Sequence, residues 1–287
     1  MSALSRLLQP SLQSDRFWLG GVMLGLAALF LSLGWKRSGD VDSLAVDLLF
    51  YAGIFWLLWR KRNRLSLEAG LGSTLAGLLL VAWLLFKSLR LFCFESLFLK
   101  LAPPAALVAV ALLASGFRGL GQYRWEALLL CLMVFPLTKL WPPIQRMFNL
   151  EVLTAAFAGF LLHYSGFESA QRGAEVILPT GSVEVSTVCS SVPMMLLLLK
   201  LALLGIIVLP MSGWRRVCVP AAALAVGFVL GGVRVAVMAA VAADPARFDY
   251  WHGEPGAQIF SALAVLLFAS LCYAVARRKD RRITADE

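Results

Sequence analysis

Long apolar runs separated by short polar segments make up most of this 287-residue chain. A helix needs about 20 mostly apolar residues to cross a hydrocarbon core of roughly 30 Å. The pattern therefore predicts an all-α fold, a polytopic transmembrane helical bundle of about eight spans. The predicted spans are residues 17–35, 44–59, 69–87, 103–117, 125–141, 191–211, 217–243 and 256–276.

A further apolar segment, residues 147–163, contains the polar residues Asn149, Glu151 and His163, and a Trp-Pro-Pro sequence at 141–143 interrupts the chain before it. If this segment crossed the membrane, the basic residues near position 60 and those near the C-terminus would lie on opposite sides. We therefore predict an interfacial or re-entrant helix on the extracytoplasmic side.

The longest polar stretch between predicted spans covers residues 164–190. Within it, AEVIL (174–178) and SVEVS (182–186) flank a Pro-Thr-Gly sequence at 179–181. Apolar or alternating segments on either side of a Pro/Gly turn are typical of a strand–turn–strand unit. We expect a small extracytoplasmic hairpin-like loop here.

The composition also indicates a membrane protein: 60% of the residues are hydrophobic, 15% are charged, and the mean hydropathy is +0.80. Soluble globular proteins carry about a quarter charged residues. This composition excludes a soluble enzyme and a disordered regulator. The five cysteines show no CxxC spacing, which argues against a disulfide-stapled module and a zinc site. With two histidines and no clustered carboxylates, we expect no metal and no cofactor.

The net charge of +9 is concentrated in basic segments between the predicted spans and at the C-terminus. The positive-inside rule places such segments in the cytoplasm. We therefore expect a multi-pass protein of the plasma (inner) membrane with both termini cytoplasmic, and no nucleic-acid partner. The basic segments are residues 60–64, Arg118 with Arg124, Arg215 with Arg216, and 277–282.

Three residues with useful chemistry lie on the extracytoplasmic side in this orientation. Cys189 directly precedes the predicted span 191–211, where the positive end of a helix dipole favours a thiolate. Arg234 lies within the predicted span 217–243, and His252 lies in the connection that follows it. Acyl transfer through a cysteine needs a thiol, an imidazole that exchanges its proton, and a cation or N–H groups that stabilise the oxyanion.

Each residue also has a simpler interpretation. Most membrane cysteines are inert small hydrophobic residues. We expect this of Cys93, Cys131, Cys218 and Cys272. A lone loop histidine is usually a surface residue, and Arg234 can pair with a structural carboxylate such as Asp47. Two other functions stay open: a transporter that binds an anionic substrate at Arg234, and a non-catalytic membrane assembly partner.

The sequence resembles the exosortase/archaeosortase family of multispanning membrane cysteine transpeptidases. The resemblance rests on LPTGSVEVSTVCSSV, FVLGGVRVAVMA and WHGEPGAQIF, and it is strongest over roughly 130–276. These segments carry, in order, a Cys before a transmembrane helix, an Arg in the next helix and a His in the following loop. Ser191 departs from the usual Cys-Ser-Gly, Gly231 stands where an Asn often precedes the Arg, and the Arg commonly found shortly after the Cys is missing.

The resemblance implies a membrane-embedded cysteine protease or transpeptidase that cleaves C-terminal sorting signals of exported proteins. Such PEP-CTERM-like signals combine a short motif, a transmembrane helix and a basic tail. Cys189 would be the nucleophile, His252 the acid and base, and Arg234 the group that stabilises the oxyanion. Glu184 and Ser190 are further candidates for substrate binding, with a solvated hairpin residue and a helix cap as their alternatives. The lipid bilayer is the other expected partner.

The resemblance and the predicted spans together divide the chain into three functional regions. Residues 1–124 are expected to form a scaffold of N-terminal transmembrane helices. Residues 125–276 are expected to form the exosortase-like catalytic membrane region, and residues 277–287 a basic cytoplasmic tail.

Overall fold

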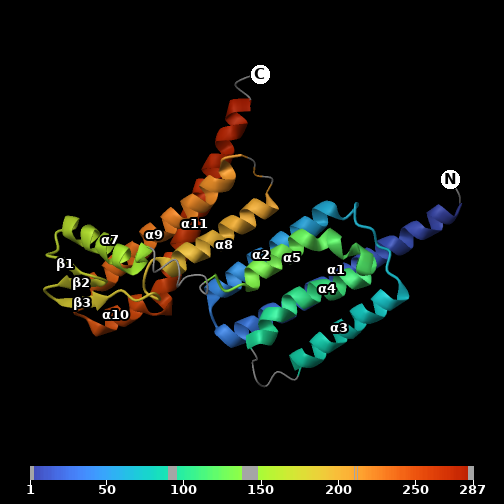
Figure 1. The fold of residues 1–287 in the computed structure, drawn as a ribbon, viewed down its shortest axis with the longest axis horizontal. Coiled ribbons are helices and arrows are strands. Elements are labelled where there is room, and N and C mark those ends of the chain that lie inside the picture. The colour runs from blue at the N-terminus through green and yellow to red at the C-terminus, as the bar shows by residue number, and fades with distance from the viewer. Residues whose placement is uncertain (1–2, 90–95, 138–147, 210, 212, 284–287) are drawn as a thin grey trace. The chain divides into compact units, whose positions relative to one another are not determined.

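The computed structural model describes residues 3–89, 96–137, 148–209, 211 and 213–283. Apolar helices and one small sheet make up the protein, which confirms the predicted all-α, polytopic fold class. The chain divides into two compact units, Met1–Phe135 and Pro136–Glu287. Figure 1 shows the helices and strands of both units with the labels used below.

The first unit is a bundle of long apolar helices. Its elements are α1 (Ala3–Ser38), α2 (Val41–Lys61), α3 (Leu71–Leu89), α4 (Ser96–Gly119), the 3-10 helix η1 (Leu120–Tyr123) and α5 (Arg124–Val134). The predicted spans 17–35, 44–59 and 69–87 correspond to α1, α2 and α3. Asp40 begins α2, because its carboxylate accepts hydrogen bonds from two backbone N–H groups of the first turn.

Among the described residues, six helical stretches are long and apolar enough to cross a membrane, compared with about eight predicted spans. One difference is that α4 and α5 belong to a single helical stretch, Leu97–Val134. The chain leaves the helical direction at Gly116 (φ 66°), and α5 then returns beside α4 (Figure 1). The predicted span 125–141 is thus represented by the 11 residues of α5, and its last part lies outside the described residues. The other difference is α8 (Val192–Val208), which has only 17 residues.

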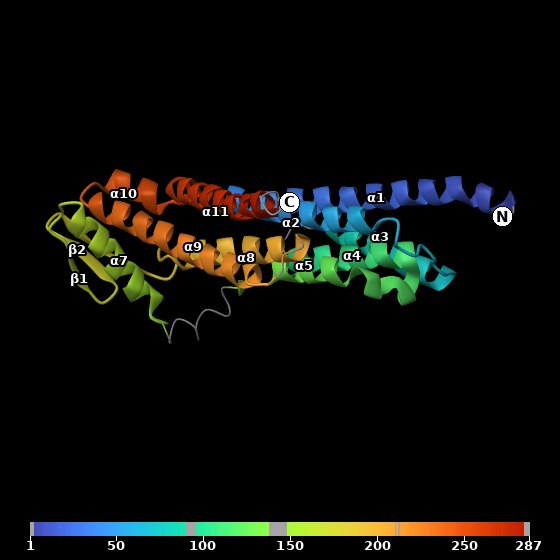
Figure 2. The same ribbon diagram turned by 90° about the horizontal axis from the view of Figure 1, so that it is seen from above.

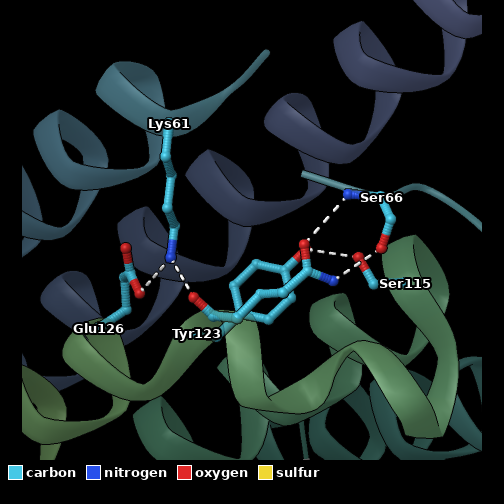
Figure 3. Close-up of polar contacts among 6 residues, drawn as sticks. Lys61, Ser66, Ser115, Tyr123 and Glu126 are labelled. Atoms are coloured by element: carbon cyan, nitrogen blue, oxygen red, sulfur yellow. Dashed lines mark hydrogen bonds and ion pairs between the residues drawn. The ribbon is translucent and has the colours of Figure 1, made fainter. Parts of the chain in front are cut away.

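A polar network joins the end of α2 to the start of α5 (Figure 3). Lys61 Nζ donates to the Glu126 carboxylate at 2.7 Å and to the Gln122 carbonyl. The Gln122 side chain accepts from the Ser66 N–H at 3.0 Å and donates to the Ser66 hydroxyl at 2.9 Å. The basic segment that contains Lys61 and the basic loop that contains Gln122 therefore lie at the same end of the first unit, as the positive-inside rule requires.

The second unit is built around α9 (Arg215–Ala240), against which α8 and α11 (Glu254–Ile283) pack in the opposite direction. Gly227 and Gly231 let α8 approach closely: a Cβ atom at position 227 would lie 2.6 Å from the Cα of Met195. Small residues four positions apart are a common means of close packing between membrane helices. The arginine pair that begins α9 and the basic end of α11 lie at the same end of this unit (Figure 1).

The other end of the second unit carries α7 (Leu150–Tyr164), α10 (Pro245–His252) and a three-stranded antiparallel sheet (Figures 1 and 2). The strands are β1 (Ala170–Arg172), β2 (Glu175–Leu178) and β3 (Gly181–Glu184), in that order. The pairing of β2 with β3 confirms the predicted strand–turn–strand unit. The sequence did not indicate β1, because Ala-Gln-Arg contains no β-branched or aromatic residue.

The predicted non-spanning segment 147–163 corresponds to α7. Its 15 residues extend about 22 Å, which is less than the thickness of a hydrocarbon core. Ala155, Ala158 and Leu162 are buried against α9 and the sheet. The structure thus gives a short, packed helix at this position, and its location at the membrane interface stays a prediction.

Some predictions fall outside the described residues, namely Cys93 and the Trp-Pro-Pro sequence at 141–143. The functional division of the chain at residue 124 also stays a prediction. The boundary between the two compact units lies nearby, after Phe135.

Candidate active site

Cys189 lies in the turn that connects β3 to α8. Its backbone N–H donates to the Ser186 carbonyl at 3.0 Å, and the next residue closes the turn onto the same carbonyl. Thr187, in the same turn, donates its hydroxyl to the carboxylate of Glu151 on α7. These contacts hold the Cys189 thiol, which is 8% exposed, at the entrance to α8.

His252 is the last residue of α10 and points at this thiol. Its Nε2 atom lies 3.0 Å from the Sγ atom of Cys189, within hydrogen-bond distance. Asp244 begins α10 by accepting hydrogen bonds from two backbone N–H groups, at 3.1 and 3.2 Å. The imidazole stacks on the ring of Phe248, with centroids 5.4 Å apart and planes inclined by 9°. The helix start and the stacked ring together orient the imidazole.

Arg234 reaches the same site from α9. Its Nη2 donates to the His252 carbonyl at 2.8 Å, and both Nη2 and Nε lie 3.4 Å from the Trp251 carbonyl. These carbonyls end α10, where unpaired C=O groups carry partial negative charge. The guanidinium therefore fixes the end of the helix that carries the imidazole. No described carboxylate pairs with Arg234, and its Nη1 makes no hydrogen bond within the described part of the chain.

The three candidate residues thus come from separate segments of the second unit and meet at one end of it. A thiol in contact with an imidazole can transfer its proton to the ring nitrogen and become a nucleophile. A partly engaged guanidinium beside them can bind a carbonyl oxygen on which negative charge develops. The arrangement has the components of acyl transfer, and the catalytic role of each residue stays a prediction.

A small polar cluster lies behind Cys189, between α7, α8 and α9. Ser191 and Thr154 are fully buried, and their hydroxyls lie 3.2 Å apart. The Ser191 hydroxyl also donates to the Phe228 carbonyl at 2.9 Å. A Cβ atom at Gly231 would lie 2.8 Å from that hydroxyl oxygen. The cluster holds the start of α8 against α9. It therefore fixes the position of Cys189 along the axis of α9 relative to Arg234.

The structure places the two second-rank candidates differently. Glu184 lies exposed at the end of β3, opposite Glu175 of β2, and no hydrogen bond or ion pair in the described structure joins it to the three site residues. Ser190 is buried; its hydroxyl donates to the Thr187 carbonyl at 2.9 Å and accepts from the Val192 N–H at 3.3 Å. Its hydroxyl is therefore occupied in closing the turn and starting α8.

The other described cysteines and the second histidine lie outside this group of three residues. Cys131 and Cys218 are exposed, Cys272 is partly exposed, and His163 contacts the ring of Tyr164 at the end of α7. Among the described residues, no group of three or more His, Cys, Asp or Glu side chains could hold a metal ion.

Sequence reasoning missed several residues that support the site. An Asp-Pro pair before a short segment is a helix-start signal, and it could have revealed α10 through Asp244. Phe248 precedes His252 by four residues, the spacing that stacks side chains on a helix. The Gly-x-x-x-Gly sequence from Gly227 to Gly231 could have predicted the close contact between α8 and α9. The use of Arg234 to bind backbone carbonyls had no signal in the sequence.

A family model described as transmembrane exosortase matches residues 35–269 of the chain, which includes the whole site. No curated protein and no solved structure matches it significantly.

Proposed function

The chain belongs to the transmembrane exosortase family, and from this premise we propose that it is a membrane-embedded cysteine transpeptidase that cleaves C-terminal sorting signals of exported proteins. The observation that carries the proposal is the 3.0 Å contact between Cys189 Sγ and His252 Nε2, with Arg234 bound to the backbone of the same histidine. Transmembrane exosortases act on exported proteins with such signals. The proposal adds that the signal has a PEP-CTERM-like motif and that Cys189, His252 and Arg234 carry out the reaction.

The first half-reaction forms a thioester. His252 Nε2 takes the thiol proton, and the sulfur of Cys189 attacks the carbonyl carbon of the scissile peptide bond. The C–S bond forms as the carbonyl π electrons move to oxygen. When the tetrahedral intermediate collapses, the C–N bond breaks and the imidazolium gives its proton to the leaving amine. The released amine carries the transmembrane helix and basic tail of the signal.

The second half-reaction transfers the acyl group. An acceptor with an N–H or O–H group attacks the thioester carbonyl while His252 takes its proton. The C–S bond then breaks, and the thiolate of Cys189 recovers the proton from the imidazolium. Water as the acceptor gives hydrolysis, and an amine gives transpeptidation.

Arg234 has two tasks in this scheme. Its Nε and Nη2 atoms hold the carbonyls at the end of α10, which keeps the imidazole against the thiol. Its Nη1 protons can be donated to the developing oxyanion. In a site that excludes water, a charged donor stabilises such an oxyanion more than it does in water. A lysine would supply one point charge and cannot make both sets of contacts.

One feature supports substrate cleavage at the extracytoplasmic face. In the second unit, the site lies at the end opposite to the arginine pair of α9 and the basic end of α11 (Figure 1). The positive-inside rule assigns those basic ends to the cytoplasm. We propose that both termini lie there and that the membrane is the plasma membrane. A substrate helix crossing the same bilayer would present its motif at the level of the thiol. Glu184, which is exposed at the end of β3, would contribute at the edge of this substrate path, and Ser190 would contribute through the turn that holds Cys189.

A transporter that binds an anion at Arg234 fits the geometry less well. Most of the guanidinium's hydrogen bonds are already directed at the carbonyls of α10. Such a transporter would also have no need of a thiol–imidazole contact and would tolerate its loss.

Substrate processing in cells tests the proposal. The cells express the protein together with an exported reporter that ends in a short motif, a transmembrane helix and a basic tail. We expect Cys189→Ala, His252→Ala and Arg234→Ala to accumulate in the membrane and leave the reporter uncleaved. Arg234→Lys should process it poorly, and Cys218→Ala, which removes an exposed thiol elsewhere, should process it normally. Normal processing by Cys189→Ala would overturn the proposal.

A further inference from the structure

The first unit contains an apolar cavity that the proposed catalysis does not use. It has a volume of about 350 Å³ and lies between α1, α2, α4 and α5. Apart from Tyr51, the side chains that line it are apolar, Leu26, Phe30 and Ile54 among them. Its size and apolar walls are those of a site for a small apolar ligand or a lipid chain.

A second, smaller pocket of about 180 Å³ adjoins this cavity and contains charged side chains. Phe30, Tyr51 and Pro103 line both spaces. Arg37 at the end of α1 and Lys100 near the start of α4 also line the smaller pocket, and neither pairs with a carboxylate in the described part of the chain.

Tyr51 lines both spaces, and its hydroxyl is the polar group that this residue brings to them. The hydroxyl is buried and has no hydrogen-bond partner among the described residues. Buried hydroxyls in proteins nearly always have a partner, so an unpartnered one that lines a cavity points to a ligand with a polar atom at that level.

The charge of the smaller pocket indicates what that ligand carries. Arg37 and Lys100 outnumber Asp47, the acidic residue among the described side chains that line it. Lys61 ends α2, and the pocket lies toward the other end of this helix. The positive-inside rule makes that other end extracytoplasmic. Basic residues on that side are not needed for topology, and arginine and lysine side chains make charge-assisted hydrogen bonds to phosphate oxygens.

We propose that the first unit binds an anionic phospholipid, with an acyl chain in the apolar cavity and the phosphate of the headgroup against Arg37 and Lys100. The Tyr51 hydroxyl then donates to an oxygen at the junction of chain and headgroup. The site belongs to the first unit alone and is independent of the proposed catalysis.

Native mass spectrometry of the full chain in detergent tests this proposal. The protein is incubated with equal amounts of phosphatidylglycerol and phosphatidylcholine that carry identical acyl chains. We expect about fivefold preferential retention of phosphatidylglycerol, as one unbalanced positive charge predicts. Arg37→Gln combined with Lys100→Gln should abolish the preference. Arg64→Gln, which removes an exposed charge at the other end of the unit, should retain it.

A second variant tests the apolar part of the site. Ala27→Phe fills the cavity from α1 and should reduce the retention of both lipids several-fold. Thermal unfolding should show that the variant is still folded. Equal retention of the two lipids by the unaltered protein would overturn the proposal. So would an unchanged preference in the double variant, or an equal loss in Arg64→Gln.

Discussion

At the scale of single residues, Ser191 occupies the space that a side chain at position 231 would need. Its hydroxyl would lie 2.8 Å from a Cβ atom at Gly231, and it donates to the Phe228 carbonyl on the same helix. The family pattern that this sequence resembles has a Gly at the first of these positions and often an Asn at the second. The two departures lie in contact with each other, and we infer an exchange in which the residue before α8, rather than α9, supplies the polar side chain.

The exchange predicts a double-mutant rescue. Gly231→Asn alone should destabilise the protein by about 1–3 kcal/mol, because the new side chain overlaps Ser191. Ser191→Gly alone should cost about 1 kcal/mol through the loss of buried hydrogen bonds. The combination of both should be more stable than Gly231→Asn. Thermal unfolding in detergent measures all three, and a double variant no more stable than Gly231→Asn would contradict the exchange.

At the scale of secondary-structure elements, the site depends on a short helix that is fixed at both ends. Asp244 begins α10 through its carboxylate, and Arg234 binds the carbonyls that end it. An eight-residue helix is too short to be stable by itself in water, so these contacts and its packing determine where the imidazole lies.

Loss of the N-terminal contact should therefore impair catalysis at a distance. Asp244→Ala removes about 1 kcal/mol of helix stabilisation without touching the thiol or the imidazole. We expect kcat/KM for a signal peptide to fall about tenfold, because small displacements of a catalytic group are costly. Asp249→Ala removes the same charge from the exposed side of the same helix and should keep most of the activity. Equal losses in the two variants would refute the positioning role.

The ion pair between α2 and α5 gives a second prediction at this scale. Glu126 is fully buried, and its Oε1 has no hydrogen-bond partner among the described residues, so its charge depends on Lys61 (Figure 3). Lys61→Met should destabilise the protein by about 3–5 kcal/mol, since it leaves a buried charge unpaired.

The matched variants separate this effect from a general loss of charge. Lys61→Met with Glu126→Leu should recover most of the stability, because no buried charge remains. Arg64→Met should change stability little. Thermal unfolding checks all of them, and a double variant as unstable as Lys61→Met would show that the pair is not the cause.

At the scale of the whole molecule, the long apolar helices were predictable because hydrophobic length alone decides which segments can cross a bilayer. The strand–turn–strand unit was predictable from the Pro-Thr-Gly turn between β-forming residues. The return of α5 beside α4 was likewise predictable from two spans joined by a short basic loop, and in the structure the turn is made at Gly116, which has a positive φ. The three candidate site residues were chosen from their chemistry and from the resemblance to the exosortase pattern, and their catalytic role stays a prediction. Their exact contacts, above all the bond from Arg234 to the His252 carbonyl, depend on how α9 and α10 pack.

The orientation of the molecule in the membrane gives a prediction at this scale. In a variant without native cysteines, a single cysteine replaces either Glu168 beside β1 or Arg64 after α2. A membrane-impermeant maleimide added to intact cells should label the first position and not the second. Labelling at position 64 alone would reverse the proposed orientation and remove the site from the extracytoplasmic face.

The most direct test of the central claim is to trap the acyl-enzyme. The purified full-length protein is mixed with a sorting-signal peptide, quenched in acid, digested and examined by mass spectrometry. The account predicts that the peptide containing Cys189 carries the N-terminal part of the substrate through a bond that neutral hydroxylamine cleaves. The adduct should be absent in Cys189→Ala, in which product formation falls by more than about a thousandfold. Product formed at the normal rate with no adduct on Cys189, or with the adduct on another cysteine, would contradict it.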